Sequence, residues 1–340
     1  MVDRRRVIHS LLMGAVAGGA GALGVGARAA VQQRDIVTDK AFGVKGDGRT
    51  NDRIALQTAI DRCVDQTLLI TGKCRIDAKG LDLRRDSHVR FAPGASIKLL
   101  PHDTSFYSIF RVWDVNNVLV ENAVLDGSKE LNAAKPELRE NGHGMGFSIA
   151  GSTEVTLIAP KTVGCWGDGI YIANSYNVPF KYSSGIRVVN HHADRCRRQG
   201  LSIISGRDIV FENPLWENIG GTQPEAGMDA EPNSNDDILE NIRIVNPVTR
   251  KCRYGIIVWL EEIPGPMPKH VDISITNHRD EGASDAAFAV SSLKLNGRRV
   301  SGQIVSRSPT WVRPKMSTVE SIDYDKAGPK IVVTNLRLVS

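Results

Sequence analysis

The sequence is poor in aromatic residues and in paired cysteines. Aromatic residues make up 6% of the 340 residues whereas 32 residues are glycine, a balance typical of short strands joined by many turns. The five cysteines are an odd number and include no CxxC pair, so neither a complete disulfide framework nor a zinc site of that kind is expected. We interpret Cys165, Cys196 and Cys252 as small apolar core residues, and a local bridge between Cys63 and Cys74 stays open.

Net charge is also low beyond the leader. Residues 1–29 hold four arginines and one aspartate and so supply +3 of the formal charge of +5, which leaves +2 for residues 30–340. So small an excess gives no electrostatic argument for nucleic acid as a partner. Gly46-Asp47-Gly48 lacks the Lys-Ser/Thr that completes a phosphate-binding loop, which argues against nucleotide binding.

A long apolar run suited to crossing a membrane is missing as well. The leader has Arg4-Arg5-Arg6 before a glycine-rich, weakly apolar run to Gly26, then Ala27-Arg28-Ala29, which fits cleavage before Ala30. Paired arginines and modest hydrophobicity resemble a twin-arginine signal, and the run is too rich in glycine to be a good membrane span. We therefore predict export to the periplasm or beyond by the twin-arginine route, with no membrane association once residues 1–29 are removed.

The chain does contain a repeated phrase, a small residue followed by alternating core and surface positions. It recurs at spacings of 23 to 31 residues, beginning at Gly146, Gly169, Gly200, Gly227 and Gly255. A second phrase, apolar-x-apolar-x-Asn, ends at Asn122, Asn190, Asn213, Asn246 and Asn277. Two short strands per repeat with an asparagine at one turn predict an all-β, single-stranded parallel β-helix, a solenoid.

Stacking of the coils predicts columns of equivalent residues. Each strand pairs with the same strand one coil later, about 4.8 Å away. One inward column is expected to contain Ile170, Leu201, Met228 and Ile256, and the next Ile172, Ile203, Ala230 and Val258. The asparagines are expected to form a ladder, because their amides tolerate left-handed backbone and can bond to one another.

Residues 30–80 carry a separate signature. The phrase from Phe42 to Asp52, Phe-Gly-Val-Lys-Gly-Asp-Gly-Arg-Thr-Asn-Asp, runs into apolar positions at Leu56, Ala59 and Ile60, spaced to bury one face of a helix. Asn51 or Asp52 can cap that helix. We expect this capping helix to close the N-terminal end of the coil, the β-helix to occupy residues 81–300, and residues 301–340 to cover the C-terminal edge.

This cap phrase, the early coil ending at Val124-Leu125-Asp126-Gly127 and the Asp168-Gly169-Ile170 strand resemble the pectate lyase and polygalacturonase superfamily of right-handed β-helices, over residues 35–300. The resemblance implies a right-handed coil but no single reaction, since the superfamily includes hydrolases, lyases, epimerases and phage tailspikes. Polygalacturonases carry an Asn-Thr-Asp strand, a paired Asp-Asp one coil later, a Gly-His-Gly turn and an Arg-Ile-Lys strand. This chain departs from that pattern: it has Arg198-Gln199-Gly200 where the Asp-Asp would stand, no Arg-Ile-Lys, and its Gly142-His143-Gly144 comes too early.

The outward positions of consecutive repeats predict a cleft. Its expected substrate-binding residues are Tyr171, Arg198, Gln199, Glu225, Arg253, Tyr254 and Trp259. Its expected catalytic carboxylates are Asp168, Asp229 and Glu231. Asp229 and Glu231 share a face about 7 Å apart along one strand, and Asp168 lies two coils earlier, about 10 Å across the sheet. Such separations suit an inverting glycosidase, in which one acid protonates the leaving oxygen and another carboxylate activates water.

We assign Asp229 as the acid and Asp168 or Glu231 as the base, with Arg198 and Tyr171 binding the substrate and Trp259 stacking on a sugar. The competing interpretation is that these acids are solvated surface residues, some of them paired with Arg198 or Arg253. Three functions stay open: a glycoside hydrolase acting on an extracellular or cell-envelope polysaccharide; a lyase or epimerase of uronates that uses Arg198, Arg253 and Tyr254; and a non-catalytic glycan-binding or structural β-helix. We expect a polysaccharide partner, a monomer or homotrimer, and neither cofactor nor metal, although the oxygen-rich residues 233–237 could take calcium.

Overall fold

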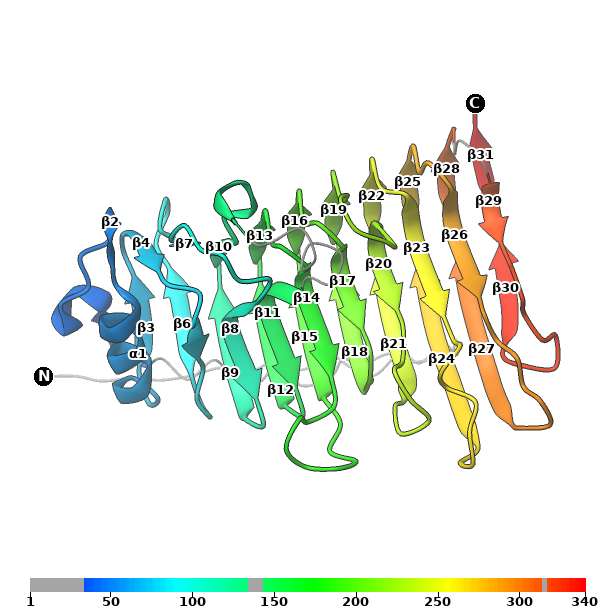
Figure 1. Ribbon diagram of the computed structural model, residues 1–340, viewed down its shortest axis with the longest axis horizontal. Helices are drawn as coiled ribbons and strands as arrows, with labels where there is room; N and C mark the ends of the chain where they lie inside the picture. Colours follow the sequence, from blue (N-terminus) through cyan, green and yellow to red (C-terminus); the bar gives the residue numbers. More distant parts are fainter. Residues whose placement is uncertain (1–33, 134–142, 314–316) are drawn as a thin grey trace, which may run out of the picture. The chain divides into compact units, whose positions relative to one another are not determined.

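The computed structural model describes residues 34–133, 143–313 and 317–340, and within them the chain winds into stacked coils (Figure 1). The strands of these coils form three parallel sheets, which we name sheets A, B and C. The predicted all-β, single-stranded right-handed parallel β-helix is thereby confirmed. The predicted twin-arginine signal, residues 1–29, lies outside the described residues.

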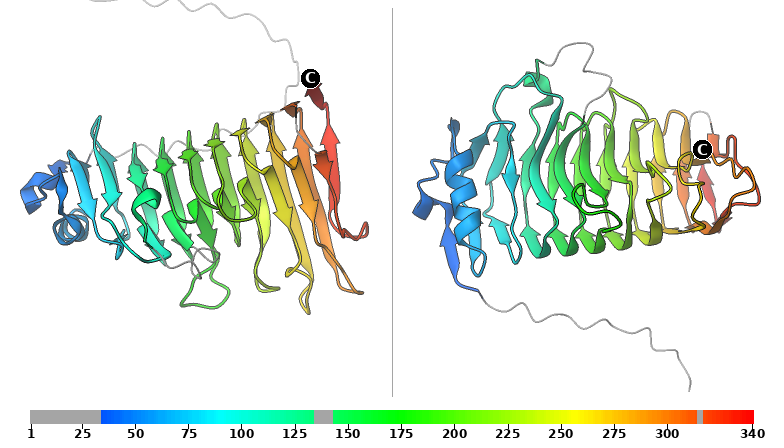
Figure 2. Two further views of the ribbon diagram at one scale, coloured as in Figure 1. Left: turned by 45° about the horizontal axis from the view of Figure 1, so that its top comes forward. Right: turned by 60° about the horizontal axis from the view of Figure 1, so that its bottom comes forward.

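Each sheet collects one strand from successive coils, so the strand order in a sheet follows the sequence (Figure 2). Sheet A contains β1 (Ile36–Thr38), β3 (Thr67–Ile70), β6 (His88–Phe91), β9 (Asn116–Glu121), β12 (Thr153–Ile158), β15 (Ser184–Val189), β18 (Gly206–Glu212), β21 (Leu239–Val245), β24 (Lys269–Thr276), β27 (Val300–Arg307) and β30 (Lys330–Thr334). Sheet B contains β2 (Asp47–Asn51), β4 (Lys73–Ile76), β7 (Ser96–Leu99), β10 (Val124–Asp126), β13 (Lys161–Val163), β16 (His192–Asp194), β19 (Leu215–Glu217), β22 (Val248–Arg250), β25 (Arg279–Glu281), β28 (Thr310–Val312) and β31 (Arg337–Val339).

Sheet C carries the predicted cleft. It contains β5 (Leu81–Asp82), β8 (Phe106–Trp113), β11 (His143–Ala150), β14 (Asp168–Ala173), β17 (Gln199–Ile203), β20 (Ala226–Ala230), β23 (Tyr254–Trp259), β26 (Ala286–Ser291) and β29 (Ser317–Glu320). The coil therefore begins inside residues 30–80, through β1 to β4, and residues 301–340 continue all three sheets.

The predicted inward columns lie in the core, which also receives side chains from sheets A and B. Ile170 pairs with Leu201, Leu201 with Met228 and Met228 with Ile256, and all four side chains are fully buried. The second column, from Ile172 to Val258, is in register in the same way. A coil cannot bury these side chains alone, so each coil depends on its neighbours for its hydrophobic stabilisation.

The predicted asparagine ladder forms at the turn between sheets A and B. Its members, Asn122, Asn190, Asn213, Asn246 and Asn277, have φ values from 53° to 57°. The amides of Asn213, Asn246 and Asn277 each donate to the side-chain oxygen of the asparagine one coil before, at 3.2, 2.9 and 2.9 Å. Between Asn122 and Asn190 the same position holds Ala159, with φ of 49°, so the ladder is interrupted there.

The N-terminal end of the coil is closed by α1 (Arg53–Arg62), which buries Leu56, Ala59 and Ile60. Asp52 stands at the N-cap position, but its buried carboxylate accepts from the backbone N–H groups of Lys45 and Gly46, at 2.7 and 2.9 Å. Asn51 instead accepts from the Arg53 N–H at 3.2 Å. Asp52 thus ties the glycine-rich cap phrase to the start of the helix. Two short 3-10 helices, η1 (Asp39–Phe42) and η2 (Lys129–Leu131), complete the described helical residues.

Two buried histidines join neighbouring coils inside the core. Trp216 Nε1 donates to His191 Nδ1 at 3.1 Å, and Trp311 Nε1 donates to His278 Nδ1 at 3.2 Å. Because Nδ1 accepts, Nε2 must carry the proton, and it lies 2.9 Å from the hydroxyl of Thr162 in the first case and of Thr249 in the second. Burial lowers the pKa of both histidines to about 3.

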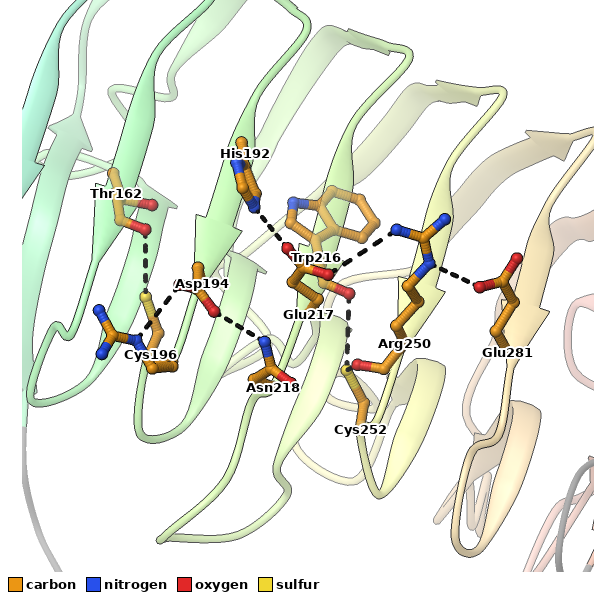
Figure 3. A network of polar contacts seen from close by, with 11 residues as sticks. Thr162, His192, Asp194, Cys196, Trp216, Glu217, Asn218, Arg250, Cys252 and Glu281 are labelled. Carbon is orange, nitrogen blue, oxygen red and sulfur yellow. Dashed lines mark hydrogen bonds and ion pairs between the residues drawn. The ribbon is translucent and has the colours of Figure 1, made fainter.

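The outer face of sheet B carries a row of charged side chains, and Cys196 and Cys252 lie in the turns that follow β16 and β22 (Figure 3). Glu217 accepts from His192 at 2.8 Å and lies 3.8 Å from Arg250, which bonds Glu281 at 2.6 Å. Such partly exposed pairs contribute little individually. All five cysteines are buried and free, so they pack as apolar residues and no bridge joins Cys63 to Cys74. No helix of the described residues is long and apolar enough to cross a membrane.

Candidate active site

The outward side chains of sheet C form a continuous strip across six coils. One column contains Arg111, Ser148, Tyr171, Ser202, Asp229 and Ile257. A parallel column contains Asp168, Gln199, Ala226 and Tyr254. The strip therefore receives Asp168 from β14 and Asp229 from β20, with β17 between them.

Asp168 is an ionisable group in a site that solvates its charge poorly. Its side chain is fully buried, and its carboxyl oxygens receive only poorly aligned hydrogen bonds, from the Ser202 hydroxyl and the Gln199 N–H. Burial raises the pKa of Asp168 to about 6, against the opposing influence of Arg198, whose Nη1 lies 3.9 Å from Oδ2. At neutral pH Asp168 is ionised, yet it takes up a proton readily.

Asp229 and Glu231 act as one unit rather than as two separate acids. Asp229 is 2% exposed, and its Oδ2 accepts from Gln199 Nε2 at 3.1 Å. Burial, followed by the charge of Glu231 and a hydrogen bond between the two carboxyl groups, raises the pKa of Asp229 well above its usual range. The hydrogen bond brings the two carboxyl groups together and favours the protonated form of Asp229. The predicted spacing of about 7 Å along the strand therefore does not separate the two carboxyl groups.

Arg198 is the cation of this cluster. Burial disfavours its charge, but the carboxyl groups of Asp168, Asp229 and Glu231 outweigh that effect and raise its pKa. Its Nη1 also lies 3.1 Å from His143 Nδ1. Burial and the nearby guanidinium lower the pKa of His143, so the imidazole is neutral at pH 7 and can accept from Arg198.

The predicted binding residues divide into two groups. Tyr171, Arg198 and Gln199 lie at the acids, and burial raises the pKa of Tyr171, so its hydroxyl stays protonated. The other four lie further along the strip or on its rim. Glu225 accepts from the Gly221 N–H at 2.7 Å, Arg253 pairs with Asp285 beneath Tyr254, and Trp259 donates to Glu261 at 3.1 Å. Of these four, Trp259 occupies the position of Glu231 one coil later, since Ala230 pairs with Val258.

Burial argues against the solvated-surface interpretation of two of the acids. Asp168 and Asp229 are not solvated surface residues, since both are buried, whereas Glu231 is partly exposed. Arg198 pairs with Asp168 as the competing interpretation expected, but Arg253 pairs with Asp285 instead.

The sequence reasoning missed a pocket of about 910 Å³ on the N-terminal side of the acids. Its lining includes Phe106 and Trp113 from β8, His143 from β11 and Tyr176 from the loop after β14. The tyrosine links it to the acids, because its hydroxyl hydrogen-bonds Ser148 and Tyr171. β8 escaped notice because Ile109 takes the place of the repeated glycine. Its four aromatic residues among eight, in a chain with few aromatics, were the available signal.

The calcium suggestion finds no geometric support. The Asp237 carboxylate accepts from the N–H groups of Asn233 and Ser234, at 2.9 and 3.0 Å, and so closes its own turn. Within the described ranges, His, Cys, Asp and Glu side chains form no group of three or more that could hold a metal ion.

Solved structures with the same fold include polysaccharide-acting enzymes. The endo-xylogalacturonan hydrolase of Aspergillus tubingensis is 11% identical, with a TM-score of 0.59 and coverage of 89% of this chain and 92% of that one. The A-module of a mannuronan C-5 epimerase from Azotobacter vinelandii is 14% identical, with a TM-score of 0.55 and coverage of 89% and 97%. A hyperthermoactive exopolygalacturonase from Thermotoga maritima is 15% identical, with a TM-score of 0.50 and coverage of 89% and 91%. No protein-family model and no curated protein matches the chain. At these identities the likeness shows the fold alone.

Proposed function

We propose that the chain is an exported glycoside hydrolase that cleaves an extracellular or cell-envelope polysaccharide. The observation that carries the proposal is the cluster of Asp168, Asp229 and Glu231 on one strip, with the pKa of Asp168 and of Asp229 raised by burial. Glycoside hydrolysis needs one carboxylic acid that keeps its proton at working pH and one carboxylate that accepts a proton. The occurrence of polysaccharide-acting enzymes with this fold supports the same substrate class.

The roles follow from the two environments. Asp229 is the proton donor and gives its proton to the glycosidic oxygen as the bond to the leaving sugar breaks. The charge of Glu231 beside it favours retention of that proton beforehand. Asp168, ionised above pH 6, removes a proton from the water that attacks the anomeric carbon. Inversion of the anomeric configuration is expected, since acid and base stand on different strands with one coil between them.

Arg198 and Gln199 position this chemistry from the intervening coil. Gln199 fixes the orientation of the Asp229 carboxyl by its 3.1 Å hydrogen bond. Arg198 favours the ionised form of Asp168. Its hydrogen bond to His143 Nδ1 fixes the orientation of its own guanidinium. Tyr171, which stays protonated, can donate to a sugar hydroxyl.

Elimination from a uronate is the second candidate, and the charged side chains already present at the site disfavour it. A lyase or epimerase must neutralise the uronate carboxylate with a cation while a base removes the C5 proton. Of the three side chains assigned to that role, Arg198 already faces three carboxyl groups, and Arg253 and Tyr254 lie with Asp285. The carboxylate of a uronate placed at these acids would be repelled by them.

The test is turnover of a panel of neutral and acidic polysaccharides by the protein starting at Ala30, with reducing ends and ultraviolet absorbance followed in parallel. New reducing ends without absorbance support hydrolysis. Absorbance that rises with product indicates elimination, and a changed sugar configuration in an uncut polymer indicates epimerisation. Retention on a glycan without any product would favour the non-catalytic binding function.

A further inference from the structure

We propose that the pocket beside the acids, lined by Phe106, Trp113 and Tyr176, binds uncharged pyranose residues of the substrate by aromatic stacking. The proposal rests on the proposed function for the identity of the ligand as a glycan. It adds the substrate class, neutral rather than uronate, and the side of the acids on which the chain is held.

The exposure of these rings is the first observation. Phe106 is 57% exposed, Trp113 37% and Tyr176 53%, although all three line one pocket. Large aromatic rings left exposed together in a concave surface mark a binding site, because burial against a ligand would stabilise them. The C–H faces of pyranose rings are apolar and match such rings, while the hydroxyls stay at the edges.

The second observation is that the Trp113 ring is held in place before any ligand arrives. Its Nε1 donates to Ser148 Oγ at 2.9 Å. Tyr176 packs edge-on against it with ring centroids 5.1 Å apart, and the Arg111 guanidinium lies 5.6 Å from its centroid. A ring fixed by three contacts loses little conformational entropy on binding.

The third observation concerns the cationic side chains of the pocket, most of which already bind other protein groups. Arg111 bonds the Asp82 carboxylate and the Lys79 carbonyl, each at 2.5 Å, and Asp77 is paired with Arg53 at 2.9 Å. Lys79 is left as a single exposed lysine in the lining. A polyuronate brings one carboxylate per sugar, so it would require a row of free cations that the described lining does not provide.

Register connects the pocket to the acids. Arg111, Ser148 and Tyr171 occupy one column of β8, β11 and β14, and Ser202 and Asp229 continue it. Coils are spaced about 4.8 Å apart, close to the length of one sugar in an extended glycan. A chain lying along the column therefore passes from the aromatic pocket to the acids without a bend.

The experiment measures binding without cleavage. The Asp168→Asn protein is titrated calorimetrically with cellohexaose, xylohexaose, mannohexaose and maltohexaose, and with hexagalacturonate and hexamannuronate. We expect one of the neutral hexaoses to bind, and Trp113→Ala or Tyr176→Ala added to Asp168→Asn to weaken that binding about tenfold. Phe180→Ala is the matched control, because Phe180 is equally exposed at 56% but does not line the pocket.

Binding of an acidic hexaose alone, or of no hexaose, overturns the inference, and so does binding that Trp113→Ala and Tyr176→Ala leave intact. The two proposals fail separately. A wild-type protein that binds a neutral hexaose through these rings but cleaves no glycan would refute the hydrolase and keep the binding site. Thermal melting of each variant checks that a loss of binding is not a loss of fold.

Discussion

Asp168 is fully buried and charged at neutral pH, so one substitution there should affect activity and stability differently. Asp168→Asn keeps the shape and removes the proton acceptor, so hydrolysis should fall by about 100-fold or more. The free energy of unfolding at pH 8 should be unchanged or higher, because an ionised group without well-formed hydrogen bonds leaves the interior. Reducing-end rates and urea melts measure both. Asp65→Asn, at an exposed acid, is the control and should change neither.

The pH dependence of hydrolysis reports the same group. If Asp168 is the base, kcat/KM should rise tenfold per pH unit below about 6 and level off above it, since the pKa of Asp168 is about 6. The raised pKa of Asp229 keeps the acid protonated over that range. Rates measured from pH 4 to 8 test this assignment. A rate that falls as the pH rises through 6 would assign the acid role to Asp168.

The buried histidines predict acid-sensitive stability. Their folded pKa of about 3 lies below the usual 6.5, so only the unfolded chain takes up their protons between those values. Stability from each histidine is complete above pH 6.5 and is lost at about 1.4 kcal/mol per pH unit as the pH falls toward 3. Urea melts of wild type and His278→Gln should show a shallower pH slope in the variant. An equal slope, as expected for the exposed His270→Gln control, would contradict this.

At the scale of the element, one substitution in the asparagine ladder should lower the free energy of unfolding, and a second should raise it. Asn213→Ala removes the bonds to Asn190 and Asn246 and puts alanine at a φ of 53°. A loss of about 1–3 kcal/mol is expected. The gap at Ala159 should respond in the opposite sense, because Ala159→Asn joins Asn122 to Asn190 at a φ that asparagine tolerates better. Denaturant unfolding of both variants tests this. A destabilised Ala159→Asn protein would count against the ladder as a source of stability.

The elements that the sequence predicts well are those set by nearest-coil pairing. The inward column from Ile170 to Ile256 and the ladder from Asn190 to Asn277 follow from period and backbone handedness, which are local properties. The pocket could not be predicted in this way. Phe106 and Trp113 belong to a strand without the repeated glycine, and Tyr176 reaches them from a loop whose path depends on tertiary contacts.

The candidate site shows the same division. Alternation placed Asp229 and Glu231 on one face, and the columns of residues just before each repeated glycine placed Asp168 and Arg198 beside them. The hydrogen bond between the Asp229 and Glu231 carboxyl groups depends on side-chain rotamers, and the neutral His143 beside Arg198 depends on a side chain that reaches across coils. Neither is encoded in spacing along the chain.

At the scale of the whole molecule, the strands of each coil pair only with those of the neighbouring coils, so damage should stay largely local. Asp52→Ala removes the carboxylate that accepts from Lys45 and Gly46. Hydrogen exchange should accelerate in β2, β3 and β4 but not in β17, β20 and β23. Exchange followed by mass spectrometry localises the effect. Uniform acceleration along the chain would show that the coils open together.

The single coil between Asp168 and Asp229 fixes the distance between their strands in units of one coil. In most enzymes the gap between two reacting groups changes gradually as loops drift. Here each group is anchored to its own coil, so the gap changes only when a whole coil is duplicated or lost, in steps of about 4.8 Å. Point substitutions can retune acidity within the site, but only rearrangement of the underlying gene in repeat-sized units can alter its span.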